Sequence, residues 1–206
     1  RGAQPTDLKL GLIGDNIAQS KAPLLHRLAG EIAGLGVTYD RLVPRERGTD
    51  FDATFDACAA GYYRGINVTY PYKERAAAKV AIDDPLVRAM GAVNTVLFDP
   101  QGARGFNTDY SGFISAYRNV RGSAPAGRVC IIGAGGVGKA IAFALLQLGL
   151  ESLWLIDLDR ARAADLAARL QAAQPGCAVT LAENPADLPD QINGLINCTP
   201  IGMVGY

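Results

Sequence analysis

The stretch Arg128-Val-Cys-Ile-Ile-Gly-Ala-Gly-Gly-Val-Gly-Lys-Ala140 decides the fold of this chain. Its segment 129–132 is short, apolar and uncharged, which is typical of a strand covered on both faces. Three glycines follow at G-x-G-x-x-G spacing: Gly133, Gly135 and Gly138. The apolar run after them predicts a helix over 137–148 that packs on a sheet.

Each glycine at this spacing has a physical role. The first permits a tight turn, the second lets the backbone approach a pyrophosphate, and the third lets the helix lie close to the strand. The free N–H groups and the dipole at the helix start attract phosphates. A second predicted strand, 152–156, is followed by Asp157, about 20 residues after the last glycine, whose carboxylate can accept hydrogen bonds from an adenosine ribose. This order of features predicts a dinucleotide-binding domain.

Two other interpretations of the glycine stretch stay open at this point. Gly133 to Lys139 also fits a phosphate loop of the G-x-x-x-x-G-K type, but Ala140 stands where a Ser or Thr would hold magnesium. The stretch can also be a structural glycine turn that binds nothing. Dinucleotide binding is favoured over both, because the strands, the helix and the acidic residue occur in the right order.

Composition limits the classes of partner. The chain has 206 residues, of which 49% are hydrophobic and 19% are charged, so it is long enough for one large domain or two small ones with hydrophobic cores. Lys+Arg and Asp+Glu both total 20, and no net field would attract nucleic acid or an anionic membrane. An uncharged apolar run long enough to span a bilayer is missing from the sequence. We therefore expect no nucleic-acid or membrane partner. We also expect a small-molecule substrate and a monomer or homodimer, which composition alone does not indicate.

The cysteines and the single histidine indicate a reducing compartment and no metal centre. The four cysteines form no C-x-x-C pair and lie mostly in apolar contexts, which favours buried thiols in the cytoplasm. One histidine, His26, cannot build a Cys/His metal site, and its apolar neighbours indicate a packing or capping role. We see no secretory segment, although the chain begins with Arg1 rather than methionine.

Strand and helix patterns alternate along the chain. Before the glycine stretch they predict strands over 7–13, 37–43, 62–68, 93–98 and 103–106, and helices over 23–34, 51–60, 73–80 and 109–120. After it they predict strands over 152–156, 177–181 and 194–197, and a helix over 160–173. The segment Arg121-Gly-Ser-Ala-Pro-Ala-Gly127 has the composition of a linker.

This alternation predicts the α/β class, with two lobes that have mostly parallel sheets. We expect residues 1–108 to form an N-terminal α/β substrate-binding and catalytic domain. Residues 109–206 should form a doubly wound (Rossmann) dinucleotide-binding domain around 129–132. The lobes should meet near residues 107–127, with the ligands in a cleft between them.

Five motifs occur in order along the chain. They are Gly65-Ile-Asn-Val-Thr-Tyr-Pro-Tyr-Lys73, Gly91-Ala-Val-Asn-Thr95, Gly105-Phe-Asn-Thr-Asp109, Gly133-Ala-Gly-Gly136 and Asn197-Cys-Thr-Pro-Ile-Gly-Met203. Together they resemble the shikimate dehydrogenase family, including its quinate/shikimate branch, over nearly the whole chain. The resemblance implies an oxidoreductase that transfers a hydride between NAD and the ring secondary alcohol of shikimate or quinate. The keto forms would be 3-dehydroshikimate and 3-dehydroquinate.

The resemblance also implies roles for individual residues. Lys73 and Asp109 match the catalytic pair, and we expect them within hydrogen-bond reach of each other, although which of them is the formal base stays open. The substrate ligands would be Ser20, Asn67, Thr69 and Asn94. The cofactor-binding residues would be Gly133, Gly135, Gly136, Val137, Gly138, Asp157, Arg160, Thr199 and Met203.

The sequence departs from the family pattern near its N-terminus. The motif Ser20-Lys-Ala-Pro23 has Ala22 where the family carries a second hydroxyl, so one donor to the substrate carboxylate is absent. The resemblance further implies a C-terminal helical segment that returns to the first lobe, whereas this sequence ends at Tyr206. The identity of the ring acid is therefore left open.

The run Asp157-Leu-Asp-Arg160 predicts NAD rather than NADP. The family's NADP-linked members carry an Asn-Arg-Thr-like run here, whose arginine meets the 2′-phosphate, whereas Asp157 would repel that phosphate. Arg160 is the group that could still permit some NADP. One alternative is an NADP-dependent shikimate dehydrogenase of aromatic amino acid biosynthesis. Another is a non-catalytic dinucleotide-sensing module, against which the presence of Lys73 and Asp109 counts.

Overall fold

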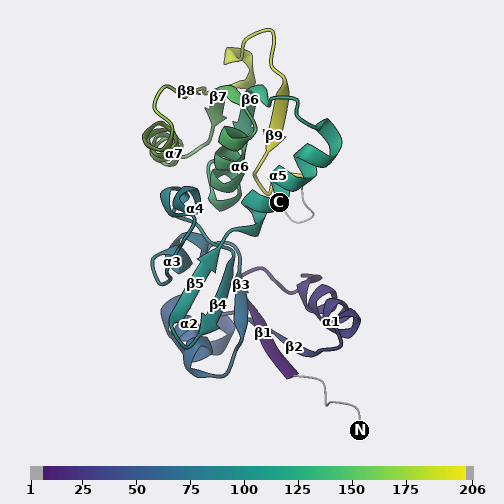
Figure 1. Cartoon of the computed structure of the whole chain (residues 1–206). Helices are drawn as coiled ribbons and strands as arrows, with labels where there is room; N and C mark the ends of the chain where they lie inside the picture. Colours follow the sequence, from purple (N-terminus) through teal and green to yellow (C-terminus); the bar gives the residue numbers. More distant parts are fainter. Residues whose placement is uncertain (1–6, 203–206) are drawn as a thin grey trace. The chain divides into compact units, whose positions relative to one another are not determined.

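The chain folds into two compact units in the computed structural model, which describes residues 7–202 (Figure 1). The first unit comprises the residues up to Asp83 together with Val93–Phe106. The second comprises Asp84–Ala92 and the residues from Asn107 onward. The chain therefore passes between the units three times. Both units contain a sheet with helices packed on it, so the predicted α/β class is confirmed.

The first unit has a five-stranded sheet in the order β2-β1-β3-β4-β5. The strands are β1 (Asp7–Ile13), β2 (Gly36–Leu42), β3 (Gly65–Val68), β4 (Thr95–Asp99) and β5 (Gly102–Phe106). The pairs β1–β2 and β1–β3 are parallel, whereas β3–β4 and β4–β5 are antiparallel. The helices are α1 (Ala22–Ile32), α2 (Phe51–Ala60) and α3 (Lys73–Ala77), with a short 3-10 helix, η1 (Arg45–Arg47).

Helix α2 shows how the local sequence sets an element and its buried face. The side chain of Asp50 accepts a hydrogen bond from the backbone N–H of Ala53 and so caps the helix start. Phe51, Phe55 and Cys58 then follow at helical spacing and are buried. Their burial joins the helix to the hydrophobic core of the first unit.

Helix α1 forms where the periodicity predicted it, but its leucines do not face the sheet. Gly30 faces β2 instead, where an added Cβ would lie 2.4 Å from a methyl group of Val37. The ring of His26 packs against Tyr39 with 4.7 Å between centroids, which agrees with a packing role. A row of apolar side chains on α1 is instead exposed, by 48% to 90%: Leu24, Leu25, Leu28 and Ile32.

Two predicted elements of this unit are each three residues shorter in the structure. The strand expected from residue 62 begins at Gly65, because Tyr62 adopts a left-handed conformation with φ of 65° that no strand accommodates. The helix expected over 73–80 ends at Ala77.

The second unit has a four-stranded parallel sheet in the order β8-β7-β6-β9. The strands are β6 (Gly127–Ile132), β7 (Leu150–Ile156), β8 (Ala178–Leu181) and β9 (Gly194–Asn197). The helices are α4 (Pro85–Met90), α5 (Thr108–Arg121), α6 (Gly136–Gln147) and α7 (Arg160–Ala173), with a 3-10 helix, η2 (Pro185–Asp187). Strand β6 lies between β7 and β9, so the prediction that 129–132 is an interior strand is confirmed.

Helix α4 was not expected from the sequence. The carboxylate of Asp84 caps its start, and Gly91 ends it in the left-handed conformation. The helix contacts both α6 and α7, and Met90 is fully buried. The segment 84–92 therefore belongs to the second unit, although its neighbours on both sides belong to the first.

The segment with linker composition connects two elements of one unit. Helix α5 ends at Arg121 and β6 begins at Gly127, both within the second unit. Residues 121–127 therefore do not join the units, and the passages between units lie at residues 83/84, 92/93 and 106/107, the last of them at the start of the range 107–127 expected from the sequence. The division of function at residue 108 stays a prediction. Within residues 7–202, no helix combines the length and apolar character needed to cross a bilayer.

Candidate active site

The glycine loop between β6 and α6 has the conformation that dinucleotide binding needs. Gly133 has a φ of +99°, and Gly138 lies so close that an added Cβ would be 1.9 Å from the carbonyl oxygen of Gly133. Nothing lies within 4 Å of a Cβ added to Gly135, the residue that precedes α6. The tight turn, the open approach and the close helix contact thus fall on the expected glycines. Gly136 and Val137 form the first turn of α6.

Two other predicted cofactor residues lie beside this loop. The carboxylate Oδ2 of Asp157, after β7, accepts a 2.6 Å hydrogen bond from the backbone N–H of Ala134. The methyl group of Thr199, after β9, would lie 2.8 Å from a Cβ added to Gly133. The ends of β7 and β9 therefore converge on the glycine loop, as carboxyl ends of parallel strands do. Met203 lies outside the described residues.

Arg160, the possible contact of a 2′-phosphate, is paired with Glu183 through its Nη1 atom. Both side chains are exposed. The second arginine at the start of α7, Arg162, lies 3.6 Å from the carboxylate of Asp159. Each arginine near the end of β7 thus has an acidic partner.

Lys139 is only 2% exposed, and its ammonium lies 3.2 Å from Asp165 of α7. Asp165 also accepts a hydrogen bond from Arg169, and these cations hold the pKa of its carboxyl below the usual range. Ala140 is fully buried and has no group that could hold magnesium. These positions favour a helix-to-helix role for Lys139 and count against a phosphate loop of the G-x-x-x-x-G-K type.

In the first unit, Lys73 begins α3, and its carbonyl oxygen accepts a hydrogen bond from Val93 N–H. Thr69 follows β3 and packs against Gly14, where an added Cβ would lie 2.3 Å from its methyl group. The absence of a side chain at Gly14 therefore lets the turns after β1 and β3 meet.

Asp15, which the sequence did not single out, joins the same two turns. Its carboxylate accepts a 2.6 Å hydrogen bond from the hydroxyl of Tyr72 and pairs with Arg45 at 3.1 Å. Burial, followed by the bond to Asp15, raises the pKa of Tyr72. No sequence motif marked Asp15, because its partners are far apart in the chain.

Ser20 lies in the turn that leads to α1. Its hydroxyl oxygen accepts a hydrogen bond from Ala22 N–H at 3.2 Å, and its carbonyl accepts one from Arg41 at 2.9 Å. The predicted carboxylate ligand thus belongs to a turn fixed to β2 and to the start of α1.

Asn67 and Asn94 share a hydrogen-bonded cluster with two residues that the sequence did not single out, Tyr39 and Thr95. The hydroxyl of Tyr39 donates to Asn67 Oδ1 at 2.7 Å, and Thr95 Oγ1 donates to Asn94 Oδ1 at 3.0 Å. Thr95 belongs to the motif that carries Asn94, so the motif could have indicated it. Tyr39 had no such signal.

Asp109 lies in the first turn of α5, whose start is capped by Asn107. Asn107 Oδ1 accepts the N–H of Tyr110 at 3.0 Å, and its buried Nδ2 donates to the carbonyl of Ala92 at 2.9 Å. Lys73 belongs to the first unit and Asp109 to the second, so their approach stays a prediction.

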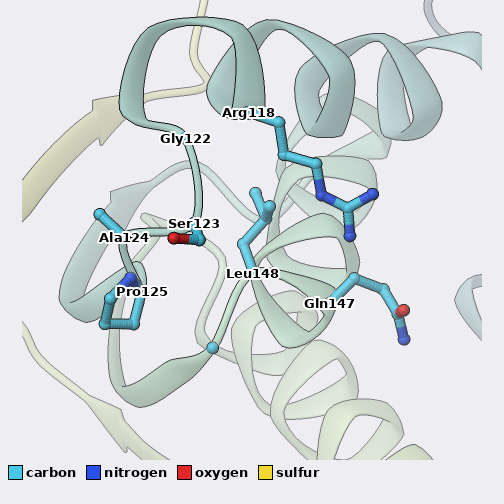
Figure 2. A pocket seen from close by; sticks show the side chains of 8 residues that line it. Arg118, Gly122, Ser123, Ala124, Pro125, Gln147 and Leu148 are labelled. Carbon is cyan, nitrogen blue, oxygen red and sulfur yellow. The ribbon is translucent and has the colours of Figure 1, made fainter.

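A hollow of about 310 Å³ in the second unit is separate from these residues (Figure 2). It lies between the loop that follows α5 and the end of α6, near the amino ends of β6 and β7. Ligands of parallel α/β sheets bind at the carboxyl ends, where the glycine loop is. The hollow therefore carries no functional assignment.

Comparison with known proteins gives concordant matches. Residues 12–96 match the family model of the shikimate dehydrogenase substrate binding domain. A shikimate dehydrogenase (NADP(+)) of Arthrobacter sp. (strain FB24) is 36% identical over 203 residues, covering 96% of this chain and 69% of that protein. A quinate/shikimate dehydrogenase (NAD(+)) of Corynebacterium efficiens is 36% identical over 205 residues, covering 96% of this chain and 72% of that protein.

A solved structure agrees with these matches. Quinate dehydrogenase from Corynebacterium glutamicum in complex with NAD superposes with a TM-score of 0.85 at 34% identity, covering 95% of this chain and 72% of that one. Identity above 30% across nearly all of this chain and more than two thirds of its relatives confirms the resemblance inferred from the five motifs. By sequence and by fold, this chain belongs to the shikimate dehydrogenase family.

Proposed function

We propose that this protein transfers a hydride between NAD and the ring secondary alcohol of shikimate, quinate or both. The observation that carries the proposal is the hydrogen-bonded pair Asn67 and Asn94 on the same unit as Lys73, in a family of dehydrogenases. The second unit supplies the glycine loop with Asp157 beside it.

The residues around the glycine loop fit a dinucleotide. The open space above Gly135 leaves room for a pyrophosphate, and the first turn of α6 contains no acidic residue that would repel it. The carboxylate of Asp157 is placed at the loop, where it can accept hydrogen bonds from ribose hydroxyls. NAD, when bound, supplies the acceptor for the hydride that leaves the substrate carbon.

The remaining chemistry belongs to side chains of the chain itself. When the alcohol carbon loses a hydride, the O–H bond must also break, so that C=O forms and one proton is released. In the proposal, the Lys73 ammonium stabilises the charge that develops on this oxygen, and the pair Lys73 and Asp109 takes the proton. Asn67 and Asn94 hold ring hydroxyls, while Ser20 and Thr69 hold the carboxylate.

Preference for NAD over NADP rests on charge at the end of β7, since relatives named for each cofactor are equally similar at 36%. Asp157 would face a 2′-phosphate of about −1.5 to −2 charge. Two unit charges about 4 Å apart repel by roughly 4 kcal/mol at an effective dielectric of about 20. Half of this repulsion, about 2 kcal/mol, still corresponds to more than a tenfold preference for NAD over NADP. The pairing of Arg160 with Glu183 partly neutralises the cation that would offset this repulsion.

The cysteines support a reducing compartment. All four are free thiols, and Cys58, Cys130 and Cys177 are buried. Buried thiols are typical of proteins in a reducing compartment, which supports the proposal that the enzyme is cytoplasmic. Its expected monomeric or homodimeric state stays a prediction.

The test is a set of initial rates for the purified protein with shikimate and quinate, each with NAD and with NADP. We expect turnover with NAD, and a fall of kcat by about 100-fold or more in Lys73→Ala with unchanged NAD affinity by calorimetry. Lys9→Ala, which removes a half-exposed lysine of the same unit, is the matched control. NAD binding without turnover of either acid would favour the sensing module. A Lys73→Ala protein with near-normal kcat would show that Lys73 has another role.

A further inference from the structure

Four side chains of the first unit form one hydrogen-bonded row. They come from three strands, β2, β3 and β4: Tyr39, Asn67, Thr95 and Asn94, the last residue before β4. The hydroxyl of Tyr39 donates to Asn67 Oδ1 at 2.7 Å. Asn67 Nδ2 donates to Thr95 Oγ1 at 3.2 Å and to the carbonyl of Asn94 at 3.4 Å. Thr95 Oγ1 in turn donates to Asn94 Oδ1 at 3.0 Å.

The strand register explains why distant residues meet here. Tyr39 pairs with Leu10 of β1, while Asn67 pairs with Leu12 and with Thr95. Side chains two residues apart on a strand point to the same face, so Tyr39, Asn67 and Thr95 share one face of the sheet. The ring of Tyr39 reaches Asn67 across β1, and His26 packs against it from α1.

The row has a fixed direction, because an NH2 group only donates and a hydroxyl has a single proton. Burial raises the pKa of Tyr39, so its hydroxyl remains a donor at physiological pH. With its oxygen held by Tyr39, Asn67 turns its NH2 group to Thr95 and to the Asn94 carbonyl. Thr95 Oγ1 accepts one of these N–H groups and donates its own proton to Asn94 Oδ1.

We propose that Tyr39 and Thr95 are positioning residues that hold Asn67 and Asn94 in one amide orientation each, so that Asn67 meets the substrate as an acceptor and Asn94 as a donor. This rests on the proposed function. Both N–H groups of Asn67 already donate to protein oxygens. Its Oδ1 accepts one proton from Tyr39 and has a second lone pair that can accept a substrate hydroxyl proton. The side-chain oxygen of Asn94 accepts the hydroxyl proton of Thr95, so its NH2 group lies on the other side of the amide.

The substrate must therefore offer a hydroxyl proton to Asn67 and a lone pair to Asn94. A ring polyol offers both. A fluorinated analogue keeps a weak acceptor and loses the donor at the substituted carbon. We expect the analogue that is fluorinated in place of the hydroxyl facing Asn67 to bind the unmodified protein more weakly than the parent acid does. In Asn67→Ala, the analogue and the parent acid should bind equally well.

The decisive experiment compares single-atom and isosteric changes in the row. Tyr39→Phe removes the hydroxyl, Thr95→Val removes the donor, and Thr95→Ser restores it. We expect the first two to raise the substrate KM about threefold to tenfold with unchanged KM for NAD, and Thr95→Ser to stay within about twofold of the unmodified protein. In an Asn94→Ala background, Thr95→Val should raise KM by a smaller factor than it does in the unmodified protein, because only its contact with Asn67 is left to lose.

Tyr63→Phe is the matched control, because the hydroxyl of Tyr63 donates to Asp40 of β2 at 2.5 Å, outside the row. It should lower the stability to urea without changing the substrate KM. An unchanged substrate KM in both Tyr39→Phe and Thr95→Val would overturn this inference and leave the proposed function intact. If the unmodified protein turned over neither shikimate nor quinate, both this inference and the proposed function would be overturned.

Discussion

Asp157 and Ala134 are joined by a 2.6 Å hydrogen bond, from the backbone N–H of Ala134 to the carboxylate Oδ2 of Asp157. The other carboxylate oxygen accepts the N–H of Asp159 at 2.8 Å. The side chain that we assign to the ribose thus also holds the glycine loop in place. Two backbone hydrogen bonds therefore fix the orientation of this carboxylate.

Releasing Arg160 should relax the cofactor preference. In Glu183→Gln the ion pair with Arg160 is lost, so the guanidinium becomes available to a 2′-phosphate. We expect the ratio of kcat/KM for NADP to that for NAD to rise about threefold to tenfold, as one exposed charge contact allows. Steady-state rates at fixed substrate measure this ratio. Glu151→Gln, an exposed change on β7, is the control and should leave the ratio unaltered. An unchanged ratio in Glu183→Gln would mean that Arg160 does not reach the 2′-phosphate.

Ala22→Ser should strengthen binding of shikimate. The variant restores a hydroxyl two residues after Ser20, at the start of α1, and one hydrogen bond to a carboxylate contributes about 1.5–3 kcal/mol. We expect the KM for shikimate to fall about tenfold or more. If the small Ala22 instead makes room for the bulkier C1 centre of quinate, the KM for quinate should rise in the same variant. Ala18→Ser, in the same turn, is the control. An unaltered KM for both acids would remove Ala22 from substrate selection.

Asn107→Ala should destabilise the second unit through two losses. The cap of α5 contributes about 1 kcal/mol, and the unsatisfied carbonyl of Ala92 adds about 1–3 kcal/mol. Asn107→Ser keeps a capping oxygen and should lie between the alanine variant and the unmodified protein in urea denaturation. Asn107→Asp keeps the cap but places a carboxylate oxygen against the carbonyl. Full stability of Asn107→Asp would show that the bond to Ala92 is unimportant.

Deprotonation of Cys58 should lower the free energy of unfolding as the pH becomes alkaline. Burial raises the pKa of its thiol from 9.0 to about 11, so the folded state keeps the proton that the unfolded chain loses. The stabilisation is complete below about pH 9 and is lost as the pH rises toward about 11. By about pH 10.5 the loss is about 2 kcal/mol. Urea denaturation from about pH 8 to about pH 10.5 should therefore show a steeper decline in the unmodified protein than in Cys58→Ala. Parallel declines would contradict the assignment.

The sequence predicted elements best where local pattern and packing agree. β1, α2, α7 and β9 have the predicted bounds, because their caps, turns and apolar periods are all local. Helix α4 was overlooked although Asp84 and Gly91 mark its ends, since six residues make too short a period to recognise. Its stability comes from packing on α6 and α7, which no local pattern reveals.

The site was predictable to a similar extent. The motifs named the groups that the structure places around the glycine loop and around Asn67. They could not name Tyr39, which reaches Asn67 only because β2 and β3 flank β1 in the sheet. The linker composition of residues 121–127 did not mark a passage between the units, because a segment rich in glycine and proline has the same composition inside a unit as between units.

The three passages of the chain between the units have a consequence for recombination. A single crossover at residue 107 would transplant α5, α6 and α7 without α4, which belongs to their unit but lies earlier in the chain. The recipient would have to supply its own helix over the site of Met90. Exchange of the second unit within this family therefore needs either residues 84–92 from the same donor or a recipient helix that packs equally well on α6 and α7.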